Sequence, residues 1–116
     1  WSLSWSKKFP MMFLPEIFEA AKEAAPKEMC GLIIQQNDIK KWILCENISE
    51  EENTFKIDEK VFSKYQLISK ILYVVHSHYM QDCKPSKLDK KMAKVLGIPY
   101  LIVSYPKLGA EVYDPR

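Results

Sequence analysis

The sequence predicts a single α/β (α+β) domain in which a mixed β-sheet is flanked by helices. At 116 residues, the chain is long enough for one hydrophobic core but not for two. Helical and strand-like patterns alternate along it in the order helix, hairpin, helix, strand, helix and two further strands. Residues 71–75 (ILYVV) form a near-continuous apolar run, as expected of a central strand covered on both faces.

The first and third helices have clear start and stop signals. The first is expected over residues 14–25, because Pro15 suits the first turn, the apolar residues form one stripe, and Pro26 ends the pattern. The third is expected over residues 87–96 and ends at Gly97.

The second helix follows a polar loop at residues 49–53 and a short extended piece at residues 54–57. Asp58 can cap this helix, which is expected to run to about residue 70. Its inward-facing residues, spaced i, i+4 and i+7, are Val61, Tyr65 and Ile68.

Strands are indicated by apolar or alternating runs between turn residues. Asn37 and Asp38 form the turn of a hairpin between the first two strands. The expected strands cover residues 30–35, 41–48, 71–75, 100–104 and 110–113.

Composition argues against several functional classes. The formal net charge of +2 is too small to indicate nucleic-acid binding, and the lysines of residues 56–94, mixed with acidic residues, are typical of a solvated surface. Three cysteines without framework spacing favour a reducing cytoplasm over a disulfide scaffold. No apolar run approaches the roughly 20 residues of a membrane span.

Residues 1–10 (WSLSWSKKFP) are set apart as an N-terminal tail, and the domain is expected to cover residues 11–116. The tail lacks an initiator Met and a signal-peptide core. An expression remnant, an upstream linker and a docking arm are the alternative readings.

His76 and His78 are the only histidines in the sequence. In a strand, residues i and i+2 point to the same face, so their imidazoles converge. They follow the apolar strand at its carboxyl end, a usual place for a site in an open sheet. Because neutral imidazole is a common zinc ligand, the pair indicates a metal site, with two surface histidines as the alternative.

Ser86 and Asp89 form a capping box at the start of the third helix. The box places the Asp89 carboxylate at the helix start, facing the loop that follows the histidines. Two histidines and one aspartate would fill three positions of a tetrahedral zinc and leave the fourth for water, as a catalytic site requires. The cap alone is the structural alternative for Ser86 and Asp89.

Glu28 is the candidate general base. It immediately precedes the first strand, where a polar side chain can overhang the sheet edge. Zinc can lower the pKa of a water toward ~7, but another group must take the proton and deliver it to the leaving group. Taken alone, a glutamate before a strand is usually a surface residue.

Together these residues resemble the JAMM motif of the JAB/MPN metalloproteases: Glu28, then His76-Ser77-His78, seven residues, Ser86, two residues and Asp89. The resemblance implies a JAB/MPN domain with a cytidine deaminase-like fold and one Zn2+ bound by His76, His78 and Asp89. It also implies that Glu28 activates the water and that Ser86 helps stabilise the oxyanion. Family members hydrolyse amide bonds, often isopeptide bonds to ubiquitin-like tags.

Within that family, residues 14–113 are most similar to the JAB domain of lambda-type phage tail assembly proteins. The segments that carry this likeness are APKEMCGLII, CENIS, TFKID, VVHSH and LGIPYLIVS. The likeness implies a protein or peptide substrate and phage tail proteins as partners, with no nucleic acid and no membrane. It places the protein in the host bacterium's cytoplasm or in the virion tail. In those phage proteins an NlpC/P60 cysteine-peptidase domain usually follows.

Three functions therefore stay open: a zinc peptidase or isopeptidase in phage tail assembly, a catalytically weak assembly module of the tail tip, and a bacterial protease that processes a ubiquitin-like sulfur carrier. Tyr79 departs from the family pattern, because many relatives have Pro after the second histidine. Cys83, in the same loop, could reach the zinc as a fourth ligand and silence the enzyme, or it is an incidental thiol.

Overall fold

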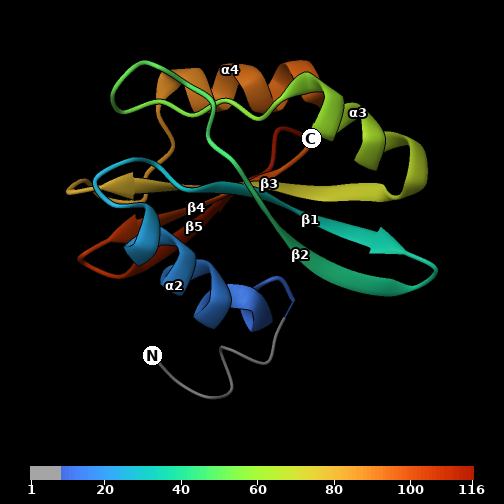
Figure 1. Ribbon diagram of the computed structural model, residues 1–116, viewed down its shortest axis with the longest axis horizontal. Helices are drawn as coiled ribbons and strands as arrows, with labels where there is room; N and C mark the ends of the chain where they lie inside the picture. Colours follow the sequence, from blue (N-terminus) through green and yellow to red (C-terminus); the bar gives the residue numbers. More distant parts are fainter. Residues whose placement is uncertain (1–8) are drawn as a thin grey trace.

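The computed structural model describes residues 9–116 and has the predicted α+β architecture (Figure 1). The helical elements are the 3₁₀ turn η1 (Met11–Phe13) and the helices α2 (Leu14–Ala24), α3 (Glu59–Ile68) and α4 (Lys87–Leu96). The strands are β1 (Cys30–Gln36), β2 (Ile39–Cys45), β3 (Lys70–Tyr79), β4 (Tyr100–Tyr105) and β5 (Gly109–Tyr113).

The strands form one five-stranded sheet in the order β2-β1-β3-β4-β5. Only β3 and β4 pair in parallel, and the other neighbours are antiparallel, so the predicted mixed sheet is confirmed. The β3–α4–β4 crossover supplies the parallel pair, as such a pair requires a long connection. This crossover sets α4 beside the strand that carries the histidines.

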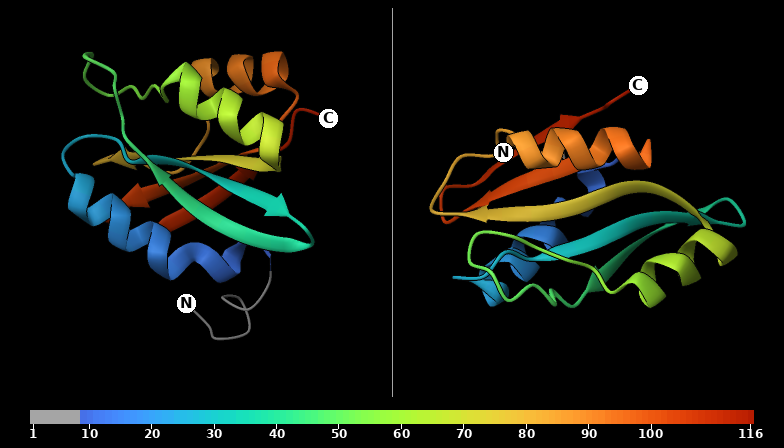
Figure 2. Two further views of the ribbon diagram at one scale, coloured as in Figure 1. Left: turned by 45° about the vertical axis from the view of Figure 1, so that its right-hand side comes forward. Right: turned by 90° about the horizontal axis from the view of Figure 1, so that it is seen from above.

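Helices cover both faces of the sheet: α3 and α4 lie on one face and α2 lies on the other (Figures 1 and 2). Strand alternation divides the apolar residues between the two faces. The strand residues packed on the α2 side are Ile33, Val75, Leu101 and Val103. Those packed on the side of α3 and α4 are Leu32, Ile34, Val74, Tyr100 and Ile102.

The local signals read from the sequence account for most element ends. Asn37 and Asp38 both have positive φ (52° and 66°), as the two-residue turn between β1 and β2 requires. Asp58 caps α3 by accepting a hydrogen bond from the Lys60 N–H. Gly97 ends α4 in the left-handed conformation, with φ 68°.

Two predicted boundaries are wrong because pairing overrides the local pattern. β2 begins at Ile39, since that residue pairs with Gln36 directly across the turn, and it ends at Cys45, opposite the first residue of β1. β3 does not end at Val75 but continues through both histidines to Tyr79, because β4 pairs with it along that length.

The inward face of α3 also differs from the prediction. The helix ends at Ile68, before the predicted residue 70, because β3 begins at Lys70. Ile68 is exposed, whereas Phe62 and Tyr65 pack against the core on this side. Phe62 and Tyr65 are three residues apart and therefore share one face of the helix, which is the face that packs against the core.

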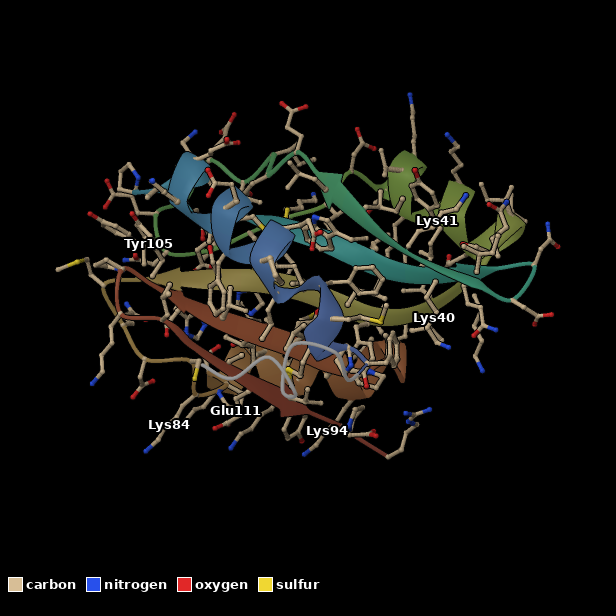
Figure 3. All side chains as sticks on the ribbon, turned by 90° about the horizontal axis from the view of Figure 1, so that it is seen from below. Lys40, Lys41, Lys84, Lys94, Tyr105 and Glu111 are labelled. Carbon is tan, nitrogen blue, oxygen red and sulfur yellow. The ribbon has the colours of Figure 1, made fainter. Side chains whose placement is uncertain are left out.

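The lysines between residues 56 and 94 are all exposed, as predicted. Figure 3, seen from the α2 side, shows Lys84 and Lys94 at the rim of the molecule and Lys40 and Lys41 on β2. Among residues 9–116, no helix combines the length and apolar character needed to cross a membrane.

Residues 1–8 of the predicted N-terminal tail lie outside the described residues. Of the remaining two, Pro10 is buried, and the Phe9 ring makes edge contacts with the rings of Phe13 and Tyr73. Phe9 and Pro10 therefore pack against the domain.

Candidate metal centre

His76 and His78 lie within β3, and both point to the face covered by α3 and α4. Their ring centroids are 4.9 Å apart, and both side chains are buried. Pairing of His76 with Ile102 and of His78 with Ser104 keeps the strand extended here, which fixes the two rings on one face. The predicted convergence of the two imidazoles is present.

Asp89 reaches both imidazoles from the first turn of α4. Its Oδ1 lies 2.9 Å from His76 Nε2, and its Oδ2 lies 3.3 Å from His78 Nε2. The capping box orients this carboxylate: the Ser86 N–H donates to Asp89 Oδ2 (2.9 Å), and the Asp89 N–H donates to Ser86 Oγ (3.1 Å). The same capping box thus caps the helix and orients the Asp89 carboxylate toward the histidines.

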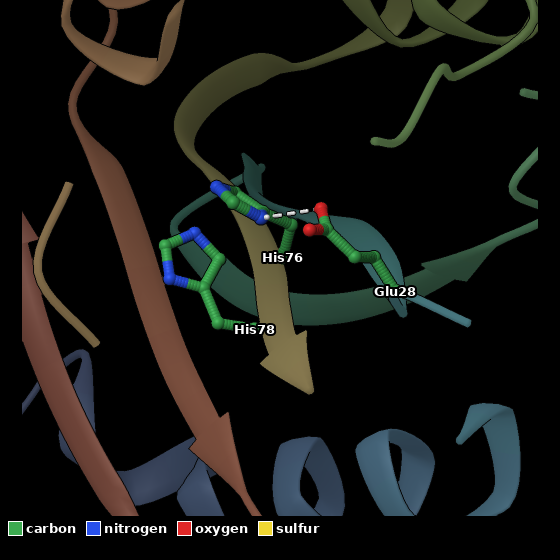
Figure 4. Close-up of side chains that lie close together, drawn as sticks. All are labelled: Glu28, His76 and His78. Atoms are coloured by element: carbon green, nitrogen blue, oxygen red, sulfur yellow. Dashed lines mark ion pairs between the residues drawn. The ribbon is translucent and has the colours of Figure 1, made fainter. Parts of the chain in front are cut away.

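Glu28 approaches the same cluster from the segment before β1. Its side chain is buried, and Oε1 lies 3.3 Å from His76 Nδ1 (Figure 4). Ser77 secures this segment to β3 from the opposite face, because its N–H donates to the Met29 carbonyl and its Oγ accepts from the Met29 N–H. Glu28 therefore lies inside the site rather than on the surface.

The direction of each pKa shift follows from burial and from the charged groups that face one another in the cluster. Burial acts to lower the pKa of His76, but the Asp89 and Glu28 carboxylates outweigh it and raise that pKa above its ordinary value. Burial also opposes the net rise in the pKa of His78, which Asp89 and the Asp82 carbonyl cause. Burial acts to raise the pKa of Asp89, yet the two imidazoles and the Ser86 N–H hold it well below its usual range.

The ring nitrogens of the histidines fit a metal ion. His78 Nδ1 donates to the Asp82 carbonyl oxygen (2.8 Å), so its Nε2 presents a lone pair to the site. Both His76 nitrogens are buried without a partner in hydrogen-bond geometry, although carboxylate oxygens lie within 3.3 Å. A buried polar atom normally has such a partner, and a cation would supply one.

The ligand atoms can be grouped in two ways that share the histidines. Glu28, His76 and His78 each offer one atom within 4.8 Å of the others. Asp89 is in direct contact with both histidines through their Nε2 atoms. Either set is buried and can hold a metal ion through nitrogen and oxygen atoms.

The cluster opens into a pocket of about 470 Å³. Glu28, His76, His78, Ser86 and Asp89 all line it, so the five predicted site residues face one common space. Ser86 is exposed at this space, whereas the other four are buried.

The cysteines lie apart from this cluster. Cys83 packs over Gly109 of β5, where a Cβ added to that glycine would lie 3.2 Å from the Cys83 Sγ. It does not line the pocket, so the structure does not place it as the fourth ligand considered from the sequence. Cys30 is fully buried, and burial raises its pKa to about 12, which agrees with a core residue rather than a nucleophile.

Four residues that orient the site were not singled out from the sequence. The Phe55 ring stacks on the His76 ring, with centroids 4.4 Å apart. Asn47 donates to the Glu28 carbonyl (2.9 Å). A serine next to an apolar strand is an unusual choice, so Ser77 could have been found from the sequence. Asp82 contributes only its backbone carbonyl, so its residue type gives no such indication.

Comparison with known proteins agrees with this geometry. A family model described as prokaryotic homologs of the JAB domain matches residues 13–113. The chain belongs to this JAB family. The fold class and the family resemblance predicted from the motif are thereby confirmed.

One curated relative of this JAB domain is the tail tip assembly protein K of Escherichia phage N15. The two sequences are 28% identical over 92 residues. The match takes in 78% of this chain but only 38% of the length of the relative. The predicted likeness to phage tail assembly proteins is therefore confirmed.

Solved structures share the fold of the JAB domain. A JAB1/MPN domain protein from Archaeoglobus fulgidus superposes with a TM-score of 0.63 and 26% identity, covering 89% of this chain and 84% of that one. A structure described as "JAMM: A Metalloprotease-like Zinc Site in the Proteasome and Signalosome" gives a TM-score of 0.58 and 26% identity, covering 89% and 82%.

Proposed function

We propose that this JAB domain is a zinc-dependent peptidase or isopeptidase of JAMM type that acts in phage tail assembly. The observation that carries the proposal is the buried meeting of two imidazoles from β3, one carboxylate from α4 and a second carboxylate from the segment before β1. A catalytic zinc site needs three ligands and a nearby base, and this cluster offers that number of groups.

In the proposed site, His76, His78 and Asp89 hold the zinc and Glu28 is the base. Asp89 contacts both histidines on their Nε2 side, whereas Glu28 contacts only His76, and on its other nitrogen. The Asp82 carbonyl fixes the His78 tautomer, as partners of metal-bound histidines commonly do. This arrangement leaves the Glu28 carboxylate available for proton transfer.

When bound, zinc would lower the pKa of the attacking water and polarise the substrate carbonyl. Glu28 would accept a proton from the attacking water and pass it to the leaving amine, a role worth roughly 10²–10⁴-fold in rate. Ser86 accepts a hydrogen bond from the Asp89 N–H, so its own O–H can donate to the developing oxyanion.

Metal analysis of matched variants tests the ligand assignment. We expect about one zinc per purified wild-type chain, loss of zinc in His78→Ala, and retention in Glu28→Gln with turnover reduced about 10²–10⁴-fold. Asp89→Asn is the matched amide substitution and should lose zinc. The opposite result, zinc lost in Glu28→Gln but kept in Asp89→Asn, would assign the metal to the set that contains Glu28.

A second function is supported by the name of the curated relative, which is a tail tip assembly protein. The domain would then be an assembly module that binds tail proteins, in the host cytoplasm or the virion tail, with little turnover. Tail assembly supported equally by wild type and Glu28→Gln would favour this module over the peptidase.

A further inference from the structure

The pocket at the metal centre continues into an apolar cleft between α3 and α4. The floor of the cleft is formed by Val74 of β3 and Tyr100 of β4, which are partners in the sheet register. Met92 and Leu96 of α4 line it on one side, and Phe62 of α3 lines it on the other. Apart from the Tyr100 hydroxyl, the side chains of these residues are apolar, unlike the four buried polar residues at the metal centre.

The course of this cleft follows from helix and strand geometry. Met92 and Leu96 lie three and seven residues after Asp89, on the same face of α4. At about 1.5 Å per residue, the lining extends roughly 10 Å along the helix from the Asp89 position. Val74 lies two residues before His76 and so shares its face of β3. An extended peptide covers that length with about three residues.

We infer that the cleft binds a bulky apolar side chain of the substrate, located within three residues of the scissile amide. The inference rests on the proposed peptidase function and names its substrate class. Leucine or phenylalanine would bury apolar surface against Phe62, Met92 and Leu96, whereas a carboxylate there would lose hydration without a buried partner. A glycine-only tail would leave this part of the pocket without a substrate side chain.

Polar residues of the pocket do not oppose this assignment. Apart from the half-buried Thr54, the polar residues that line it outside the metal centre are exposed, so they stay hydrated when the cleft is filled; they are Asn53, Lys56, Glu59, Ser63 and Gln81. Its volume of about 470 Å³ falls in the range of binding pockets that enclose most of a ligand. The whole pocket is therefore large enough for a side chain in the cleft as well as the substrate backbone at the metal centre.

A set of peptide reporters tests the inference with zinc-loaded wild-type protein. In each reporter, a tripeptide is joined to lysine through either the α- or the ε-amine. The tripeptide is all glycine except at one position, which carries Leu, Phe or Asp, and each of the three positions is varied in turn. A second set varies the three residues on the amine side. We expect kcat/KM to rise about 10- to 200-fold for Leu or Phe over Gly at one of these positions, and no rise for Asp.

Two positions on α4 provide matched variants. Met92 lines the cleft and is 37% exposed, whereas Val95 is 70% exposed and lies outside the pocket lining. Met92→Trp should fill the cleft and abolish the preference for Leu while zinc content stays at the wild-type level. Val95→Trp, on the solvent side of the same helix, should keep the wild-type preference. Met92→Ala, which enlarges the cleft, should shift the preference from Leu toward Phe.

The outcomes separate this inference from the proposed function. Cleavage at equal rates for Gly, Leu and Asp reporters overturns the apolar cleft but leaves the peptidase intact. An unchanged Leu preference in a zinc-loaded Met92→Trp variant also overturns it. Absence of cleavage of every reporter by the zinc-loaded wild type contradicts the peptidase, and the substrate class falls with it.

Discussion

Asn47 shows how one side chain can organise a site that it does not enter. Its Nδ2 donates to the carbonyls of Glu28 and Thr54, and its Oδ1 accepts from the N–H groups of Ser49 and Lys56. These four bonds join the segment before β1 to the loop that carries Phe55. Glu28 and the Phe55 ring stacked on His76 are therefore positioned through the same amide.

Replacing this amide should weaken both the fold and the site. We expect Asn47→Ala to lower the free energy of unfolding by about 2–4 kcal/mol, because several partly buried backbone groups lose their partner. Urea denaturation measures this loss, and turnover should fall as Glu28 and Phe55 lose their support. Asn47→Asp keeps the two acceptor bonds and should fall between wild type and Asn47→Ala. Equal unfolding midpoints for all three proteins would refute this role.

At the residue scale, the meeting of His76, His78 and Asp89 was predictable, but most of the contacts that support them were not. The two histidines and Asp89 follow from strand period and a capping box, which are local patterns. The contact of Asp82 with His78 and that of Glu28 with Asn47 are made by backbone carbonyls, which every residue type possesses. Such contacts leave no trace in residue identity, so only the folded chain shows them.

The start of α4 combines a helix cap with contacts to both histidines in a single turn. The Ser86 side chain caps the helix by accepting a hydrogen bond from the Asp89 N–H. The Asp89 carboxylate accepts one from the Ser86 N–H and also contacts both imidazoles. Aspartate near a helix N-terminus also interacts favourably with the helix dipole. A stability effect at this cap therefore has to be separated from a catalytic one.

The cap of α3 provides the comparison. We expect Ser86→Ala and Asp58→Ala each to lower the free energy of unfolding by about 1 kcal/mol, because each removes one N-cap bond. Only Ser86→Ala should also reduce turnover at equal zinc content. Denaturation curves and reporter hydrolysis check the pair, and equal turnover in both variants would exclude a catalytic role for the Ser86 hydroxyl.

At the element scale, the sequence predicted helix starts better than strand ends. N-cap residues such as Asp58 and Ser86 act within one turn and can be identified from the local sequence. The extent of β3 depends on β4, which lies more than twenty residues further along the chain. A strand's length is thus set by a partner that local periodicity does not include, and β3 was predicted too short for that reason.

In the whole molecule, the proposed ligands and base come from distant segments. Glu28 precedes β1, the histidines lie in β3, and Asp89 begins α4 after a separate loop. An ion held by these elements binds the folded chain and not the unfolded one. Metal binding is therefore coupled to the stability of the entire sheet.

Removal of metal should accordingly lower the melting temperature. At a free zinc concentration one hundred times the Kd, binding stabilises the folded state by about 2.7 kcal/mol. We expect a chelator to remove this stabilisation from the wild type and from Glu28→Gln, as differential scanning calorimetry measures. The His78→Ala protein should melt at the same temperature with and without chelator. A chelator shift of equal size in His78→Ala would contradict binding at this site.

The position of α4 in the chain has a consequence for biosynthesis. A ribosome releases Glu28 and both histidines before it releases Asp89, since chains emerge from the N-terminal end. β4, which flanks the histidines, emerges later still. Nascent chains interrupted before residue 89 would lack the proposed ligand Asp89, so the proposed hydrolytic activity would appear only once translation has passed the start of α4.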